Sequence, residues 1–309
     1  MRIVFMGTPE SAVPSLRRLV DANHEIVAVW TQPDKPAGRG KKLHQSPVKD
    51  FALSHHLPIH QPAKIKTAEA KELFASHRAE AAIVVAYGKI LPSEFLNAYP
   101  HGCINVHFSL LPKYRGAAPV NWAIVNGENE TGVTTMKIVQ ELDAGPILLQ
   151  NKTEIAKNET APALMSRLAE MGADLISETM RKLASLTPRE QSPDQASFAP
   201  ILKREDGMID WSMDAFEIER RVRGFQPWPN AHTVFHSRRL ILWEAAPETI
   251  ENTSRIPGQI LRADGDVLVV SAADATALRI SAVQLEGSRR IGVRDFINGF
   301  HPNVGTRLG

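Results

Sequence analysis

Uninterrupted apolar runs, separated by helical patterns, dominate the first half of the sequence. Residues 2–6, 25–31 and 81–86 are rich in apolar and β-branched side chains and lack the polar alternation of a half-exposed strand. Strands of this kind are buried on both faces, which is typical of a parallel sheet covered by helices. Further strands are expected at 103–107, 133–139 and 147–155, and a long amphipathic helix at 160–186. The pattern predicts an α/β fold with a Rossmann-like, mostly parallel sheet.

The first turn, Gly7-Thr8-Pro9-Glu10, is expected to join a strand to a helix. Thr8 is a good N-cap residue, Pro9 suits the first helical position, and the carboxylate of Glu10 complements the helix dipole. Pro14 lies in the same region, so a later start of the helix also fits the sequence. The turn lacks the glycine pattern of a dinucleotide site, which argues against NAD.

The pattern changes after residue 186. A polar stretch with Pro188 and Pro193 predicts a linker at 187–206. Beyond it we expect a helix at 214–225 and then short strands at 231–235, 239–245, 258–261, 266–271 and 277–285. Short strands at this spacing, over about 100 residues, indicate a small OB-like β-barrel. The predicted domains are therefore 1–186 and 207–309.

Composition excludes several classes of protein. The single cysteine, Cys103, allows neither a disulfide within the chain nor a cysteine-based metal cluster. No apolar run approaches the roughly 18 residues of a membrane span, and the apolar start is too short for a signal peptide, so we expect a soluble, cytoplasmic protein. The net charge of +2 does not indicate a nucleic-acid partner. Basic residues gather between Lys35 and Lys49, but such a run is most often a solvated loop.

Three polar residues are candidates for catalysis. Asn105 and His107 alternate with apolar residues, so on a strand they project from one face, roughly 6–7 Å apart. Asp143 follows the next long strand, in the turn Leu142-Asp143-Ala144-Gly145. At the carboxyl edge of the sheet, an amide, an imidazole and a carboxylate would suit acyl transfer. A hydrogen-bonded structural pair and an ordinary Asp-Gly turn are the commoner uses of such patterns.

A cysteine nucleophile is the alternative, because Cys103 shares its strand face with His107. Four residues of strand separate the two by about 13 Å, which is too far for a hydrogen bond. Cys103 is therefore expected to be a small buried apolar residue. The sequence has no Gly-x-Ser-x-Gly elbow, no Walker loop and no two-His helix motif, so it predicts no serine hydrolase, nucleoside triphosphatase or zinc site.

Longer motifs are similar to those of a known family. The segments Asn105-Val106-His107-Phe108-Ser109-Leu110-Leu111-Pro112, Arg115-Gly116-Ala117-Ala118-Pro119 and Leu142-Asp143-Ala144-Gly145 resemble the signature of the folate-dependent formyltransferases. The resemblance implies transfer of a formyl group from 10-formyltetrahydrofolate to an amine, with Asn105, His107 and Asp143 as catalytic residues. The implied folate-binding residues are Ser109, Leu110, Leu111 and Pro112, together with Tyr87, Gly88 and Ile90 of the pterin-pocket wall.

The rest of the chain is similar to the members of this family that formylate a methionine-charged initiator tRNA. The segments that carry this likeness are 5–9, 31–42, 207–211 and 225–229. The implied partners are initiator methionyl-tRNA and tetrahydrofolate, bound by a monomer without a metal. The implied tRNA contacts are Lys35, Arg39, Lys41 and Lys42. In this account 1–186 is catalytic, 187–206 is a linker and 207–309 assists tRNA binding.

Two other classes stay open at this point. One is a formyltransferase that acts on a small amine such as a sugar nucleotide, and the other is a non-catalytic RNA-binding relative. Two features also depart from the family. Phe108 stands where other members carry a small residue, often Gly, so it either narrows the site beside His107 or fills a gap in the core. The chain beyond residue 204 has no lysine and more acidic than basic residues, unlike the basic tRNA-binding surface of the family.

Overall fold

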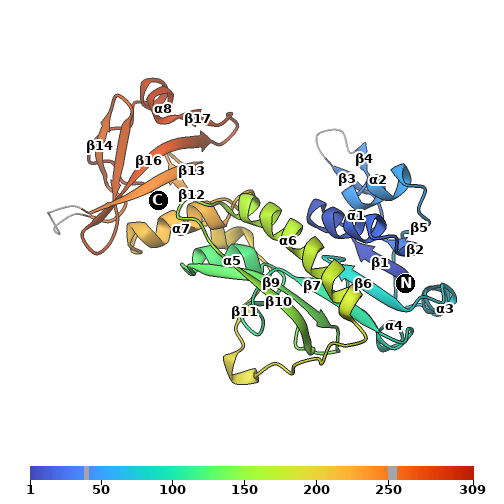
Figure 1. The fold of residues 1–309 in the computed structure, drawn as a ribbon. Coiled ribbons are helices and arrows are strands. Elements are labelled where there is room, and N and C mark those ends of the chain that lie inside the picture. The colour runs from blue at the N-terminus through green and yellow to red at the C-terminus, as the bar shows by residue number, and fades with distance from the viewer. Residues whose placement is uncertain (38–41, 250–255) are drawn as a thin grey trace. The chain divides into compact units, whose positions relative to one another are not determined.

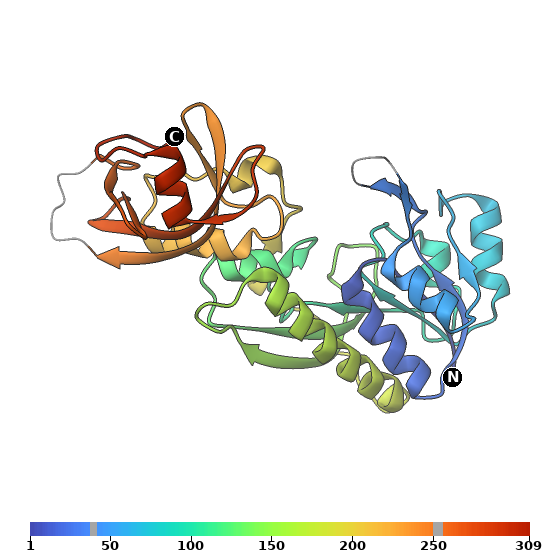
Figure 2. The same cartoon turned by 90° about the horizontal axis from the view of Figure 1, so that it is seen from above.

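The computed structural model describes residues 1–37, 42–249 and 256–309, which form two compact units (Figure 1 and Figure 2). The first comprises Met1–Pro119, Glu130–Glu154 and Met165–Ala199. The second comprises Val120–Asn129, Ile155–Leu164 and Pro200–Gly309. Two short internal segments thus belong with the C-terminal residues. The stretch at 187–206 is divided, because residues up to Ala199 belong to the first unit.

The first unit is built on a seven-stranded sheet in the order β10-β9-β7-β6-β1-β2-β5. Its strands are β1 (Arg2–Gly7), β2 (Glu25–Trp30), β5 (Ile59–His60), β6 (Ala81–Val85), β7 (Cys103–His107), β9 (Glu130–Lys137) and β10 (Ile147–Glu154). The strands from β7 to β5 are parallel, whereas the β7–β9 and β9–β10 pairs are antiparallel. This mixed, mostly parallel sheet confirms the fold class expected for the first half of the chain.

Helices cover both faces of this sheet, as expected for strands that are apolar on both sides. They are α1 (Val13–Asp21), α2 (Pro47–Ser54), α3 (Ala68–Ser76), α4 (Ser93–Leu96) and most of α6 (Ala161–Lys182). On one face α1 and α6 lie side by side (Figure 2), and Arg18 forms an ion pair with Asp174 between them. On the other face Phe74 of α3 stacks on Phe95 of α4, and each of these rings makes a T-shaped contact with Trp30.

The prediction that Thr8 caps the first helix is wrong. A short 3-10 turn, Glu10–Ala12, comes first, and Ala12 occupies the cap position of α1. Pro14 is the physical reason, because proline has no N–H and is tolerated only in the first turn of a helix. The hydroxyl of Thr8 instead donates a hydrogen bond to the carbonyl of Tyr87, 3.2 Å away.

The two faces of β7 have different surroundings. A Cβ built on Gly172 of α6 would lie 2.9 Å from Val106 Cγ1 and 3.4 Å from Phe108 Cε1, so Val106 and Phe108 both contact this helix. Phe108 is buried and fills space beside the helix. Because strand side chains alternate, Asn105 and His107 project from the opposite face.

Replacing Gly172 by Ala is expected to destabilise the first unit by about 1–3 kcal/mol, because the added methyl group overlaps Val106 in a packed core. The overlap outweighs the gain of about 1 kcal/mol that Ala brings to a helix interior. Gly299→Ala in α8 (Val293–Phe300) is the matched control, since nothing lies within 4 Å of its added Cβ. It should stabilise the second unit slightly. Urea unfolding of both variants measures the two free energies, and effects of equal sign would contradict this account.

The second unit is built on an antiparallel sheet in the order β12-β13-β16-β15-β14, with β17 (Ile291–Gly292) beside β16. The other strands are β12 (His232–Phe235), β13 (Arg238–Thr249), β14 (Ile260–Asp264), β15 (Val267–Ser271) and β16 (Thr276–Leu285). The helices α7 (Ala215–Gly224) and α8 contribute Ile218 and Phe296 to the core of this unit. A separate antiparallel C-terminal domain is thus confirmed, whereas α8 was not expected. No helix in the described part of the chain is long and apolar enough to cross a membrane.

Candidate active site

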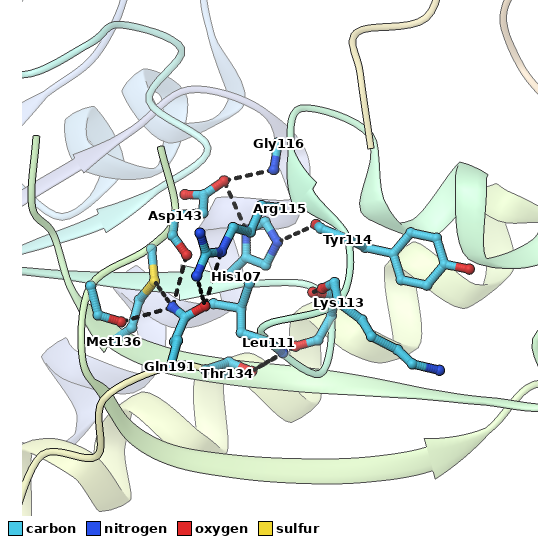
Figure 3. A network of polar contacts seen from close by, with 12 residues as sticks. His107, Leu111, Lys113, Tyr114, Arg115, Gly116, Thr134, Met136, Asp143 and Gln191 are labelled. Atoms are coloured by element: carbon cyan, nitrogen blue, oxygen red, sulfur yellow. Dashed lines mark hydrogen bonds and ion pairs between the residues drawn. The ribbon is translucent and has the colours of Figure 1, made fainter. Parts of the chain in front are cut away.

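His107 lies at the end of β7 with its ring buried and both ring nitrogens facing polar groups (Figure 3). Its Nε2 is 2.9 Å from the carbonyl oxygen of Tyr114. Because a carbonyl only accepts, Nε2 carries the proton of that bond. Nδ1 lies 3.7 Å from Oδ2 of Asp143, where an ion pair forms if the ring is doubly protonated. The structure therefore brings together two of the three residues expected to be catalytic.

Asp143 reaches His107 by a route that the sequence did not indicate. β9 runs antiparallel to β7, so its end lies beside the start of β7, where Ile138 N–H donates to the carbonyl of Cys103 at 2.8 Å. The loop at 138–146 must fold back to place Asp143 near His107. Asp143 has φ +48°, and its carboxylate accepts a hydrogen bond from Gly116 N–H at 2.8 Å. Loop geometry, and not a shared strand edge, thus assembles the pair.

Asn105 is half-buried and lies two residues before His107 on β7. Strand alternation places its side chain on the same face as His107. Within the described ranges of the chain, no hydrogen bond engages the Asn105 amide group. An amide with two N–H donors therefore stands beside the His107–Asp143 pair and is available to a ligand.

Cys103 is the buried apolar residue that the sequence predicts. It lies in a hydrophobic cluster with Phe95 and Tyr99, and its thiol donates to the carbonyl of Phe95 at 3.4 Å. Burial raises the pKa of the Cys103 thiol to about 12. A thiol in these surroundings is not ionised at neutral pH, which argues against the cysteine nucleophile.

Alkylation of Cys103 by iodoacetamide at pH 8 is expected to be at least about 100-fold slower in the folded protein than in urea, because the buried thiol is neither ionised nor accessible. Since the chain has one cysteine, mass spectrometry of the intact protein gives the rate directly. Unfolded protein is the control. Equal rates in the folded and unfolded states would show that the thiol is reactive.

Sequence reasoning missed Gln191, which lies at the centre of the polar network of Figure 3. Its side-chain N–H groups donate to the carbonyls of Asp143 and Gly145, each at 2.8 Å. Its Oε1 accepts from Nε and Nη2 of Arg115, at 3.1 and 2.9 Å. Gln191 stands in a polar stretch without periodicity, so no local pattern marks it as buried.

The loop expected to bind folate, Ser109 to Pro112, is held by the neighbouring strands. Thr134 of β9 accepts from Leu111 N–H at 3.2 Å and donates to the carbonyl of Ser109 at 2.7 Å. Gln150 of β10 donates to the carbonyl of Leu111 at 2.8 Å and to Thr134 Oγ1 at 2.9 Å. Side chains of β9 and β10 therefore hold the backbone of this loop by hydrogen bonds.

The other residues expected at the folate site, Tyr87, Gly88 and Ile90, differ in burial and in the groups that they could present to a ligand. The phenol of Tyr87 is buried in the apolar cluster with Trp30, which raises the pKa of Tyr87. The carbonyls of Tyr87 and Gly88 accept from Nε2 of Gln32 at 3.0 and 3.1 Å. Gly88 has φ +79°, and a Cβ there would lie 2.5 Å from Gln32 Nε2. The side chain of Ile90 is 76% exposed, so it is the apolar group of this set that is open to a ligand.

The basic residues expected to contact tRNA are only partly described. Arg39 and Lys41 lie outside the described residues. Lys35 belongs to β3 (Lys35–Ala37) and Lys42 to β4 (Lys42–His44), which pair as an antiparallel hairpin.

The base of this hairpin is ordered by polar contacts. Asp34 accepts hydrogen bonds from Gln61 Nε2 at 2.8 Å and from Lys49 Nζ at 2.6 Å. These bonds, that from Gln61 foremost, hold the pKa of Asp34 below its usual range. Gln61 Nε2 also donates to the carbonyl of Gln32, so the same contacts extend to the residue that supports Tyr87 and Gly88.

No group of three or more His, Cys, Asp or Glu residues suited to a metal ion occurs among the residues that the structure describes.

Comparison with known proteins places this chain in a family. Residues 1–180 match the sequence model of the formyl transferase family, and residues 201–301 match that of the formyl transferase C-terminal domain. The chain therefore belongs to the formyl transferase family. Two curated relatives, each named methionyl-tRNA formyltransferase, come from Caldanaerobacter subterraneus and Koribacter versatilis. They are 46% and 48% identical to this chain, and the matches cover all of this chain and 100% and 99% of the relatives.

Two solved structures share the fold. The sugar 3N-formyl transferase WlaRD has a TM-score of 0.68 at 20% identity, over 94% of this chain and 99% of its own. HypX from Aquifex aeolicus, solved with tetrahydrofolic acid, has a TM-score of 0.63 at 18% identity, over 98% of this chain and 48% of its own. At these identities the likeness concerns the fold alone.

Proposed function

We propose that this protein transfers the formyl group of 10-formyltetrahydrofolate to the α-amino group of initiator methionyl-tRNA, giving N-formylmethionyl-tRNA for translation initiation. The observation that carries the proposal is the His107–Asp143 pair beside the Asn105 amide, in a chain that matches methionyl-tRNA formyltransferases over its whole length. The same site would also serve a small amine, but the relatives that match at this identity act, by name, on methionyl-tRNA.

The site residues have distinct roles in this proposal. The neutral amine of methionyl-tRNA adds to the formyl carbon, and negative charge develops on the formyl oxygen. Asn105 donates an N–H to that oxygen. Nε2–H of His107 is bonded to the carbonyl of Tyr114, so Nδ1, 3.7 Å from Asp143, is the ring nitrogen that faces the site. In the doubly protonated ring, Nδ1–H is the second donor to the formyl oxygen. Donors placed where charge develops lower the barrier without reorganisation.

Asp143 acts on the proton of the attacking amine. As the new carbon–nitrogen bond forms, the amine becomes acidic, and the Asp143 carboxylate accepts its proton. When the bond from the formyl carbon to N10 of the folate breaks, the proton passes to N10. The formyl donor supplies the one-carbon group, and the chain needs no metal for these steps.

The folate and the tRNA are assigned to separate surfaces. Folate binds to the loop of Ser109, Leu110, Leu111 and Pro112 and to the wall of Tyr87, Gly88 and Ile90. Hydrogen bonds from β9 and β10 hold the loop, and Ile90 of the wall is exposed. The tRNA acceptor end is bound by Lys35, Arg39, Lys41 and Lys42 through phosphate contacts. In this proposal 1–186 is the catalytic domain, 187–206 joins it to 207–309, and the latter is an OB-like barrel that assists tRNA binding. The protein acts as a cytoplasmic monomer.

Loss of either the amide or the carboxylate should reduce turnover strongly. Asn105→Ala removes an oxyanion donor, which costs roughly 3–4 kcal/mol of transition-state stabilisation, or about 10²–10³ in kcat. Asp143→Asn removes the proton acceptor and should have a comparable effect. Initial rates with methionine-charged initiator tRNA, with circular dichroism as the folding control, measure both variants. Near-normal turnover in either variant would refute the role assigned to that residue.

Discrimination between charged initiator and elongator tRNA tests the assignment of the basic residues to the tRNA acceptor end. The wild-type enzyme should formylate charged initiator tRNA and not charged elongator tRNA, because an acceptor end without a strong first base pair costs least to open. Arg39→Leu should weaken this discrimination and leave folate binding, measured by fluorescence titration, unchanged. Undiminished discrimination would refute the role of Arg39. Absence of transfer to either tRNA, with folate still bound, would favour a small-amine substrate.

A further inference from the structure

Residues 187–199 follow the outer edge of the active-site loops. Arg189 and Ile147 exchange two backbone hydrogen bonds of 2.8 Å. Further along, the carbonyl of Ser197 accepts from Arg115 N–H at 2.8 Å, and β11 (Phe198–Ala199) pairs with β8 (Arg115–Gly116). Between these two attachments Gln191 turns inward and is only 9% exposed, although its neighbours in the chain are exposed.

The amide of Gln191 is fully used. A primary amide has two N–H donors and an oxygen with two lone pairs. The two donors reach the carbonyls of Asp143 and Gly145, and the oxygen accepts two bonds from Arg115. A side chain with one donor fewer, or without the oxygen, would leave a buried group unpaired.

The groups held by Gln191 belong to two different loops. Asp143 and Gly145 lie in the loop at 138–146, which must fold back across the sheet to reach His107. Arg115 begins the segment whose next residue, Gly116, donates its N–H to the Asp143 carboxylate. Gln191 therefore joins the loop that carries this carboxylate to the loop that carries its hydrogen-bond donor (Figure 3).

We infer that Gln191 is a positioning residue, which holds the backbone on either side of Asp143 so that the carboxylate faces His107. This inference rests on the proposed function, because it gives Asp143 a part in formyl transfer. Gln191 touches no reacting atom and acts through the position of Asp143. A small displacement of a catalytic group lowers the rate steeply, up to about 100-fold for 1 Å.

Gln191→Glu is the sharpest variant, because it keeps the size of the side chain and its acceptor for Arg115 but removes both N–H donors. The carboxylate would face the carbonyl oxygens of Asp143 and Gly145 and repel them. We expect kcat to fall about 10–100-fold, with KM for charged tRNA changed by less than about threefold, and the pH dependence of kcat to change shape. Gln195→Glu is the matched control, since it makes the same change at an exposed residue of the same segment, and it should behave as wild type.

Two further measurements separate positioning from loss of fold. In an Asp143→Asn background, Gln191→Glu should lower kcat less than about twofold, because the carboxylate that it positions is absent. Hydrogen exchange of the Gly116 amide, which bonds to that carboxylate, should be faster in Gln191→Glu than in wild type. Three outcomes would overturn the inference. The first is a wild-type kcat in Gln191→Glu, and the second is full additivity of the effects of Gln191→Glu and Asp143→Asn on kcat. The third is a loss of activity that only follows the fraction of unfolded protein.

The exchange measurement does not depend on activity. If wild-type protein formylated no charged tRNA, the proposed function would fail. Faster exchange of Gly116 in Gln191→Glu would still support the positioning of Asp143, and unchanged exchange would refute it.

Discussion

The buried charge of Arg115 is the constraint on which the arrangement of the site depends. The residue is 4% exposed, and a guanidinium in such surroundings must be hydrogen-bonded. Glu141 binds one of its nitrogens at 3.2 Å but is itself 76% exposed, so the ion pair is partly screened by water. The remaining bonds go to the neutral amide of Gln191, whose other end holds the backbone of Asp143 and Gly145. Satisfying one buried cation thus fixes the loop that carries the carboxylate beside His107.

His107 is oriented from two sides by segments that are far apart in the sequence. The carbonyl of Tyr114 fixes which ring nitrogen carries a proton, and Asp143 faces the other nitrogen. Tyr114 is positioned in turn, because its N–H donates to Ser197 Oγ at 3.0 Å. The tautomer and the orientation of the imidazole therefore depend on Tyr114 and Asp143, which precede α6 in the chain, and on Ser197, which follows it. These contacts define the orientation of a histidine that lies at the end of a strand.

The sequence predicted the parts of the fold that depend on local periodicity. The alternating segment at 103–107 forms β7, as predicted. The predicted helix start at Thr8 is wrong, because Pro14 has to lie in the first turn of α1. The motif around Asn105, His107 and Asp143 identified candidate chemistry, but not how the groups meet, since that depends on β9 being antiparallel. Gln191 could not be found at all. Its neighbours are polar, and its burial arises only from contacts with Arg115 and the Asp143 loop, which no short window of sequence contains.

The pair of strands β9 and β10 supports both halves of the proposed chemistry. Thr134 and Gln150 fix the loop from Ser109 to Leu111 through a hydroxyl that is wholly buried and has both donor and acceptor partners. The same two strands are joined by the loop that bears Asp143. The paired strands β9 and β10 therefore support both the loop assigned to folate and the loop that carries the Asp143 carboxylate. Protein groups that share a rigid support lose little conformational entropy when the reactants bind. The two bound reactants are then held in position, so the transfer between them proceeds as if it were unimolecular.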